Sequence, residues 1–216
     1  PHPDDESLGC GAAIRDATGN GYPVTVVVVT DGRHSHRGSK VWPPHRVARQ
    51  RRREVEDATT ILTGTTLGLV WLGLEDGGAP TDERAIAPVA DDLADLCARR
   101  GITAVWSSWN RDPHIDHQNT ALLAQAVVAR RCEMIWQSYP IWGRFEQLDD
   151  SELPPLSAIR LYDSAGQADV KAAAVAAHRS QMTPLIDDDP DGFVMDSDMQ
   201  AHFINAPEIF IRESPR

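Results

Sequence analysis

Residues 22–32, YPVTVVVVTDG, decide the fold class of this 216-residue chain. The apolar run from Val24 to Val29 is interrupted only by Thr25, and its length and branched side chains are typical of a buried strand that ends in a turn. Residues 45–64, HRVARQRRREVEDATTILTG, follow with apolar residues on one side and a glycine at the end, as in an amphipathic helix. This stretch therefore predicts a strand followed by a helix.

The same alternation continues to the end of the chain. Further strands are predicted at 67–74, 102–109, 133–139, 157–163 and 207–213, and further helices at 82–101, 119–131 and 168–182. Pro88 lies inside one helical pattern, where we expect it to start, kink or split the helix. Alternating strands and helices imply βαβ units and a mostly parallel sheet with helices on both faces. We predict a single three-layer, Rossmann-like α/β domain over residues 1–216, with one more strand upstream of Pro1.

Composition narrows the function classes. The net charge of −11 argues against a nucleic-acid partner, because phosphate binding needs clustered cations. No segment is long and apolar enough to predict a transmembrane helix. The three cysteines show no metal-binding spacing and indicate reduced thiols in a cytoplasmic protein. A homo-oligomer is compatible with the sequence.

Residues 1–6, PHPDDE, crowd a histidine and three acids in front of a predicted helix. In parallel sheets, ligands bind beyond the carboxyl ends of the strands, so this turn is a candidate site if a strand precedes it. His2 and Asp5 are three residues apart, which puts both side chains on one face of a first helical turn. Zinc hydrolases commonly use three such protein ligands and leave a fourth position for water.

A second cluster, HIDH at 114–117, follows the predicted strand at 102–109 and occupies an equivalent place. One of its histidines completes a His-Asp-His set, and the spacing alone does not say which one. Asp4 is then left to serve as a base, and the other histidine can stabilise an oxyanion or protonate a leaving amine. Asp116 can receive the second ring N–H of that histidine. Either cluster alone is more often a solvated turn, but two at equivalent strand ends favour a metal site.

At this point the sequence resembles the LmbE-like, or PIG-L, family of zinc-dependent N-deacetylases. PHPDDE matches the family's first motif at every position, and HIDH matches the second, usually His-Pro-Asp-His, with Ile115 at a spacer position. Arg51 and Glu54 match an Arg-x-x-Glu helix, LGLEDGG at 72–78 resembles a substrate-binding loop, and HRSQ at 178–181 resembles a late His-x-Ser-Gln motif.

The resemblance implies a role for each matching position. It implies one Zn²⁺ per chain, for which Fe²⁺ or Co²⁺ can substitute, with ligands His2, Asp5 and His117. It implies three catalytic residues: Asp4 as general base, His114 as electrophile or acid, and Asp116 as the group that orients His114. It implies that Arg51 and Asp76 contact substrate, with a weaker indication for His178. One departure is Asp112, since mycothiol-pathway members place a tyrosine two residues before the second motif.

The resulting expectation is a zinc-dependent hydrolase that removes the acetyl group from an N-acetylated amino sugar, such as an N-acetylglucosamine glycoside. The alternatives are an amidase of a larger amide, such as a thiol conjugate, and a non-catalytic sugar-binding protein. The sequence does not name the sugar acceptor. His34 and His36 lie in a loop at a strand end, where we expect a substrate-facing or mobile loop rather than a second metal.

Overall fold

The computed structural model describes residues 1–147, 149 and 153–214. By its internal contacts the chain divides into two compact units. The N-terminal unit comprises His2–Gly78 and Asp163–Glu208, and the central unit comprises Ala79–Tyr162 and Ile209–Arg216 together with Pro1. The predicted single-domain organisation stays a prediction.

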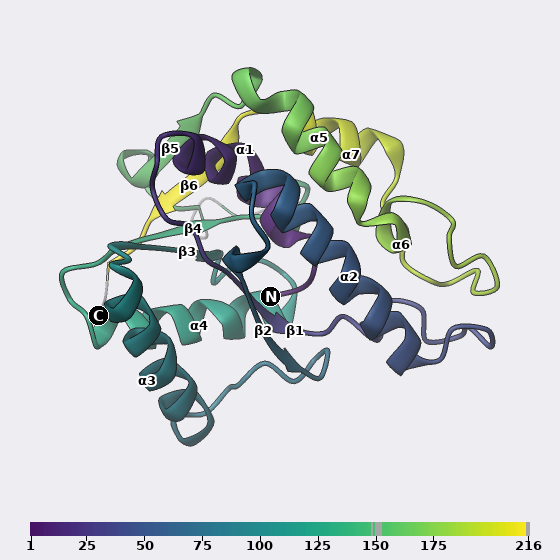
Figure 1. Cartoon of the computed structure of the whole chain (residues 1–216), viewed down its shortest axis with the longest axis horizontal. Coiled ribbons are helices and arrows are strands. Elements are labelled where there is room, and N and C mark those ends of the chain that lie inside the picture. Colours follow the sequence, from purple (N-terminus) through teal and green to yellow (C-terminus); the bar gives the residue numbers. More distant parts are fainter. Residues whose placement is uncertain (148, 150–152, 215–216) are drawn as a thin grey trace. The chain divides into compact units, whose positions relative to one another are not determined.

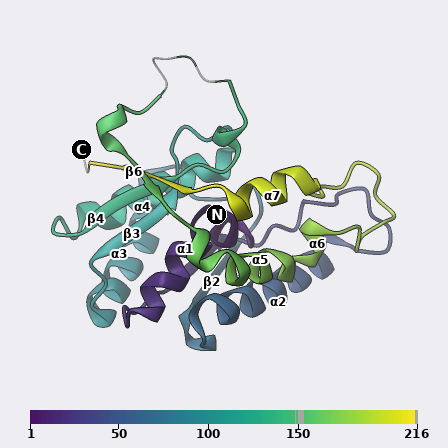
Figure 2. The ribbon, with the colours of Figure 1, turned by 90° about the horizontal axis from the view of Figure 1, so that it is seen from above.

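The N-terminal unit contains a parallel strand pair, β1 (Val26–Thr30) and β2 (Leu69–Leu74). Its helices are α1 (Asp5–Gly19), α2 (Pro44–Thr63), α5 (Ala168–Ala177), α6 (Arg179–Met182) and α7 (Ser197–Asn205). Helix α2 packs against α1 and α5, and α5 lies beside α7 (Figures 1 and 2). A proline in the first turn of α2 and a left-handed Gly64 at its end set its bounds, close to the predicted ones.

The central unit contains the strands β3 (Ala104–Ser108), β4 (Ile135–Tyr139) and β5 (Ile159–Tyr162), with most of β6 (Glu208–Arg212). Their order is β3-β4-β6-β5, with β3 parallel and β6 antiparallel to β4. Helix α4 (Ile115–Ala129) packs on β3, β4 and α3 (Glu83–Arg100). Short 3₁₀ helices are Thr66–Gly68, Trp142–Arg144, Leu156–Ala158 and Ala165–Gln167.

The predicted α/β class is confirmed, and the differences from the predicted elements are local. Pro88 lies within a continuous α3, in the second turn, so the helix is not split there. Asp82 caps the start of α3, because its side chain accepts from the N–H of Ala85. The helix predicted at 168–182 is divided at His178, whose backbone is not helical. Helix α7 was not predicted. Among the described residues, no helix is both long and apolar enough to cross a membrane.

Candidate functional site

The first motif forms a strained turn at the start of α1. Asp4 has φ 142° and ψ −28°, and it is the one non-glycine residue with positive φ in the described part of the chain. Such a backbone conformation costs on the order of 1–3 kcal/mol and persists only where neighbours hold it. Glu6 Oε2 accepts from the N–H of Asp4 at 3.1 Å, and the carbonyl of Asp4 accepts from Ser7 and Leu8. The turn is therefore fixed from within the motif.

His2 and Asp5 present a pair of donor atoms that suits a metal ion. The backbone N–H of His2 donates to Asp5 Oδ2 at 2.8 Å, and Nδ1 of the same histidine lies 3.4 Å from that oxygen. Two ligand atoms bound to one tetrahedral zinc are about 3.3 Å apart, given bond lengths of about 2.0–2.1 Å. An imidazole nitrogen and a carboxylate oxygen are also ligands that zinc accepts. This half of the predicted ligand set fits the metal.

Asp76, which follows β2, contacts His2 rather than standing alone. His2 Nε2 lies 3.3 Å from Asp76 Oδ1, and Asp76 Oδ2 accepts from the backbone N–H of His34 at 2.9 Å. Burial alone would raise the pKa of Asp76, but its hydrogen bond and charge interaction with His2 and the His34 bond hold the pKa well below its usual range. A carboxylate in this place orients an imidazole. The predicted substrate role of Asp76 stays a prediction.

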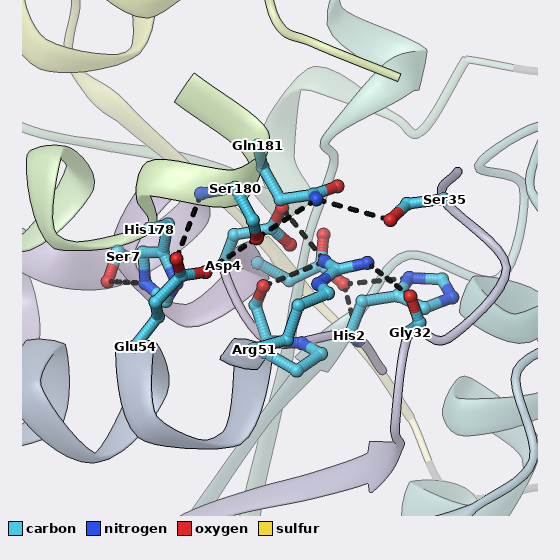
Figure 3. A network of polar contacts seen from close by, with 12 residues as sticks. His2, Asp4, Ser7, Gly32, Ser35, Arg51, Glu54, His178, Ser180 and Gln181 are labelled. Atoms are coloured by element: carbon cyan, nitrogen blue, oxygen red, sulfur yellow. Dashed lines mark hydrogen bonds and ion pairs between the residues drawn. The ribbon is translucent and has the colours of Figure 1, made fainter. Parts of the chain in front are cut away.

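Asp4 is buried beside Arg51 (Figure 3). Burial raises the pKa of the Asp4 carboxyl to about 6, and the guanidinium of Arg51 offsets part of that rise. A carboxyl group that titrates near neutral pH is suited to accept and return a proton. The geometry thus supports the predicted role of Asp4 as a base.

Arg51 itself is only 4% exposed and has three hydrogen bonds to the polypeptide. Its guanidinium donates to the carbonyls of Gly32 (3.0 Å) and Pro3 (2.8 Å) and to Asp4 Oδ2 (3.1 Å). Gly32 has φ 62°, and a Cβ there would lie 2.3 Å from the guanidinium, so the close approach requires glycine. These contacts favour a positioning role for Arg51 over the predicted substrate contact.

His178 is buried at the break between α5 and α6 and faces the first motif. Its Nε2 lies 3.0 Å from Glu6 Oε1 and 3.1 Å from Ser7 Oγ, and Ser7 donates to the same Glu6 oxygen (Figure 3). Burial lowers the pKa of His178, but the charge of Glu6, its hydrogen bond and the charges of Asp4 and Glu54 together outweigh burial, so the pKa is raised. Because His178 has no exposed surface, these contacts favour a role in holding Glu6, and its predicted contact with substrate stays a prediction.

A second buried network joins α2 to the late motif, and sequence reasoning did not predict it. Glu54 accepts from the N–H and Oγ of Ser180 at 2.9 and 2.6 Å (Figure 3). Gln181 Nε2 donates to Ser35 Oγ at 3.2 Å in the loop that follows β1. This loop also contains His36, which is buried. The expectation that the loop faces substrate or is mobile stays a prediction. The Arg-x-x-Glu and His-x-Ser-Gln patterns are thus two ends of one structural network.

The second motif begins α4 in the central unit, after β3. His117 is fully buried, and its Nδ1 lies 3.1 Å from Asp112 Oδ1. The carbonyl of His117 accepts from Ser108 Oγ at 2.8 Å. A carboxylate oxygen 3.1 Å from Nδ1 favours a proton on that nitrogen, which leaves the lone pair of Nε2 as a ligand atom. The arrangement suits a metal ligand, and the predicted role of His117 stays a prediction.

His114 is held differently. It is the N-cap residue of α4, and its Nδ1 accepts from the backbone N–H of Asp116 at 3.1 Å. In a neutral ring this places the proton on Nε2, so that His114 is a hydrogen-bond donor at that atom. The carboxylate of Asp116 accepts from the N–H of Ala79 at 3.3 Å. The backbone N–H of Asp116 thus helps to orient the His114 ring, and the predicted contact of its side chain with that ring stays a prediction.

The predicted site residues are divided between the two units. The N-terminal unit contains His2, Asp4, Asp5, Arg51, Asp76 and His178, and the central unit contains His114, Asp116 and His117. Sequence reasoning missed the orienting carboxylates Glu6 and Asp112. Asp112 was noted only as a departure from a tyrosine, although its place two residues before HIDH was a usable signal.

Comparison with solved structures supports the fold. An N,N'-diacetylchitobiose deacetylase from Pyrococcus horikoshii is 20% identical, with a TM-score of 0.71 over 100% of this chain and 82% of that chain. The A40926 pseudoaglycone deacetylase Dbv21 is 20% identical, with a TM-score of 0.70 over 98% and 94% of the two chains. The 4-carboxy-2-hydroxymuconate hydratase GalB from Pseudomonas putida KT2440 is 18% identical, with a TM-score of 0.71 over 100% and 94%. Because a hydratase shares this fold, the fold alone does not fix the reaction.

Comparison of sequences assigns the family. No curated protein sequence matches the chain. The family model described as PIG-L, GlcNAc-PI de-N-acetylase, matches residues 1–128, which include both histidine motifs and the arginine helix. The chain therefore belongs to the PIG-L (LmbE-like) family.

Proposed function

We propose that this protein is a zinc-dependent hydrolase that removes the acetyl group from an N-acetylated amino sugar and releases acetate. The observation that carries the proposal is the first motif. It sets a buried carboxyl group with a pKa of about 6, Asp4, next to the donor pair His2 and Asp5. A metal-ligand pair with an adjacent base is the arrangement needed for hydrolysis by an activated water.

The proposal requires one metal ion held jointly by His2, Asp5 and His117, as the family motifs imply. Two observations support zinc: the 3.4 Å spacing of the His2 and Asp5 donor atoms, and the orientation of His117 by Asp112. Zinc, when bound, lowers the pKa of a water molecule and polarises a carbonyl group. Fe²⁺ and Co²⁺ accept the same kinds of ligand.

The chain's own residues then supply the proton transfers. Asp4 takes a proton from water as the water oxygen attacks the acetamide carbonyl carbon. His114 donates its Nε2–H to the carbonyl oxygen, where negative charge develops. Asp4 or His114 then gives a proton to the amide nitrogen, the C–N bond breaks, and a free amine and acetate leave.

The substrate class follows from the family and not from a described pocket. The family description names GlcNAc-PI, and two structural relatives are named as deacetylases. An N-acetylglucosamine-type glycoside or glycoconjugate is accordingly proposed.

Acetate release from a panel of N-acetylated sugars tests the proposal. Zinc-loaded protein should release acetate and free amine in equal amounts, and a chelator should stop the reaction reversibly. Amides with larger acyl groups, included in the panel, would reveal an amidase of wider range. Absence of any amine product across the panel would overturn the proposal, and hydration of an unsaturated hydroxy acid would point to chemistry like that named for GalB.

A further inference from the structure

Asp112 lies in the central unit, in the loop between β3 and α4, and none of the family motifs quoted above includes it. Asp112 and His117 are both 0% exposed. Asp112 Oδ1 lies 3.1 Å from His117 Nδ1. Burying a carboxylate is unfavourable unless partners compensate for the lost hydration, so the partners of Asp112 indicate its role.

The other oxygen of Asp112 is fixed by backbone donors. Asp112 Oδ2 accepts from the N–H of Ile141 at 2.8 Å and from the N–H of Gly143 at 3.2 Å. The carbonyl of Asp112 accepts from Gln118 Nε2 at 2.9 Å, one residue beyond the second motif. The carboxylate therefore has one defined orientation, with Oδ1 facing the histidine.

We propose that Asp112 is a positioning residue that fixes the tautomer of His117, with the proton on Nδ1 and the lone pair on Nε2 directed to the metal. The inference rests on the proposed metal centre. His114 is the internal contrast, because its Nδ1 accepts a backbone N–H and its proton lies on Nε2. The two histidines of HIDH are thus held in opposite tautomers, which suits one to a metal and the other to hydrogen-bond donation.

Asp112→Asn tests this assignment sharply. The asparagine amide has only one oxygen that can accept hydrogen bonds. This oxygen should take the position of Oδ2, because the backbone N–H groups of Ile141 and Gly143 donate there. The reverse orientation would leave the backbone donors of Ile141 and Gly143 without an acceptor, which is unfavourable. The amide N–H₂ then faces His117 Nδ1, which must accept, and the ring proton moves to Nε2. The variant keeps the shape of the loop but reverses the tautomer.

Two measurements read the result, and neither is catalytic activity. Zinc affinity, measured by competition with a chelator, should fall about 10–100-fold in Asp112→Asn. Nitrogen-15 NMR of histidine side chains in the metal-free protein should show His117 with its proton on Nδ1 in the wild type and on Nε2 in the variant. Asp82→Asn is the matched control, because asparagine caps α3 as aspartate does, and its zinc affinity should equal that of the wild type.

Each outcome decides the inference. Wild-type affinity in Asp112→Asn would overturn it, and so would a wild-type His117 with its proton on Nε2. The second reading needs only the wild-type protein, so it still decides the matter if the variant does not fold. If both readings are as expected but the zinc-loaded wild-type protein releases no acetate, the proposed function is contradicted and the role of Asp112 is left intact.

Discussion

At the residue scale, the site includes a residue, Asp4, in an unfavourable backbone conformation. Asp4 combines a positive φ with a buried carboxyl group, and both features destabilise the folded chain. Glu6 bonds to this turn from within the motif, and Arg51 bonds to it from α2. The strained position thus persists because buried partners over-determine it, as is common where a side chain must be aimed at reacting atoms.

Asp4→Asn should lower turnover about 10²–10⁴-fold, the usual contribution of a general base, while the bound metal is retained. Asparagine tolerates positive φ, so the turn should keep its shape. Steady-state kinetics and metal analysis of the variant check this. Loss of the metal instead would mean that Asp4 is a ligand and that the roles of Asp4 and Asp5 are reversed.

The same variant should be more stable than the wild type without metal. The folded pKa of Asp4 is about 6 and the ordinary value is 3.8, so the ionised carboxylate destabilises the fold above pH 6 by roughly a few kcal/mol. Below about pH 4 the carboxyl is protonated in both states, and the cost disappears. Urea unfolding of both proteins at pH 7.5 and pH 4 should show a stability difference that shrinks at the lower pH. An equal difference at both pH values would contradict the burial argument.

Arg51→Lys separates positioning from substrate contact. Lysine keeps the charge, but its single nitrogen cannot span the carbonyls of Gly32 and Pro3 and the carboxylate of Asp4. We expect kcat to fall with little change in KM, because the carboxylate of Asp4 loses its orientation while the contacts that bind the substrate remain. A raised KM at unchanged kcat would restore the substrate contact that the family resemblance implies.

At the element scale, α1 shows what periodicity cannot predict. Its backbone leaves the helical region at Cys10, and the N–H groups of Ala12 and Ala13 donate to the two oxygens of Glu208 at 2.7 and 2.9 Å. Lys171 of α5 donates to Glu208 at 2.7 Å, and both side chains are fully buried. A residue 196 positions away thus caps the second half of the helix, which no local pattern encodes.

Glu208→Gln should destabilise the N-terminal unit by about 3–5 kcal/mol, since it removes the countercharge of a buried lysine. The double variant Lys171→Met with Glu208→Gln should recover much of this loss, because no buried charge then remains. Chemical denaturation of the wild type and the variants checks this. A single variant as stable as the wild type would show that the pair contributes little.

At the scale of the whole molecule, the sequence predicts what is local or repeated. The strand predicted within 22–32 appears as Val26–Thr30, and the glycine that ends α2 and the order of the predicted elements also appear in the structure. The candidate ligands were found because two short motifs combine histidine with carboxylate residues. The partners Glu6, Asp112 and Glu208 were not found, since burial and long-range packing decide which carboxylate orients which side chain. Helix α7 was missed because its nine residues are too few for a helical period to stand out in the sequence.

The last prediction concerns whether the two units share one metal. If His2 and Asp5 bind the same ion as His117, zinc should protect backbone amides from hydrogen exchange in both units. In a zinc titration, the protection of the two units should rise together and be complete at one equivalent per chain. At a zinc concentration 100 times the Kd, the added stability is about 2.7 kcal/mol. His117→Ala should abolish the protection of residues 2–6 by zinc, although His117 belongs to the central unit and residues 2–6 belong to the N-terminal unit. His114→Ala is the matched control and should retain it, because its proposed partner is the substrate. Protection that stays within a single unit, or that survives His117→Ala, would rule out a jointly held metal.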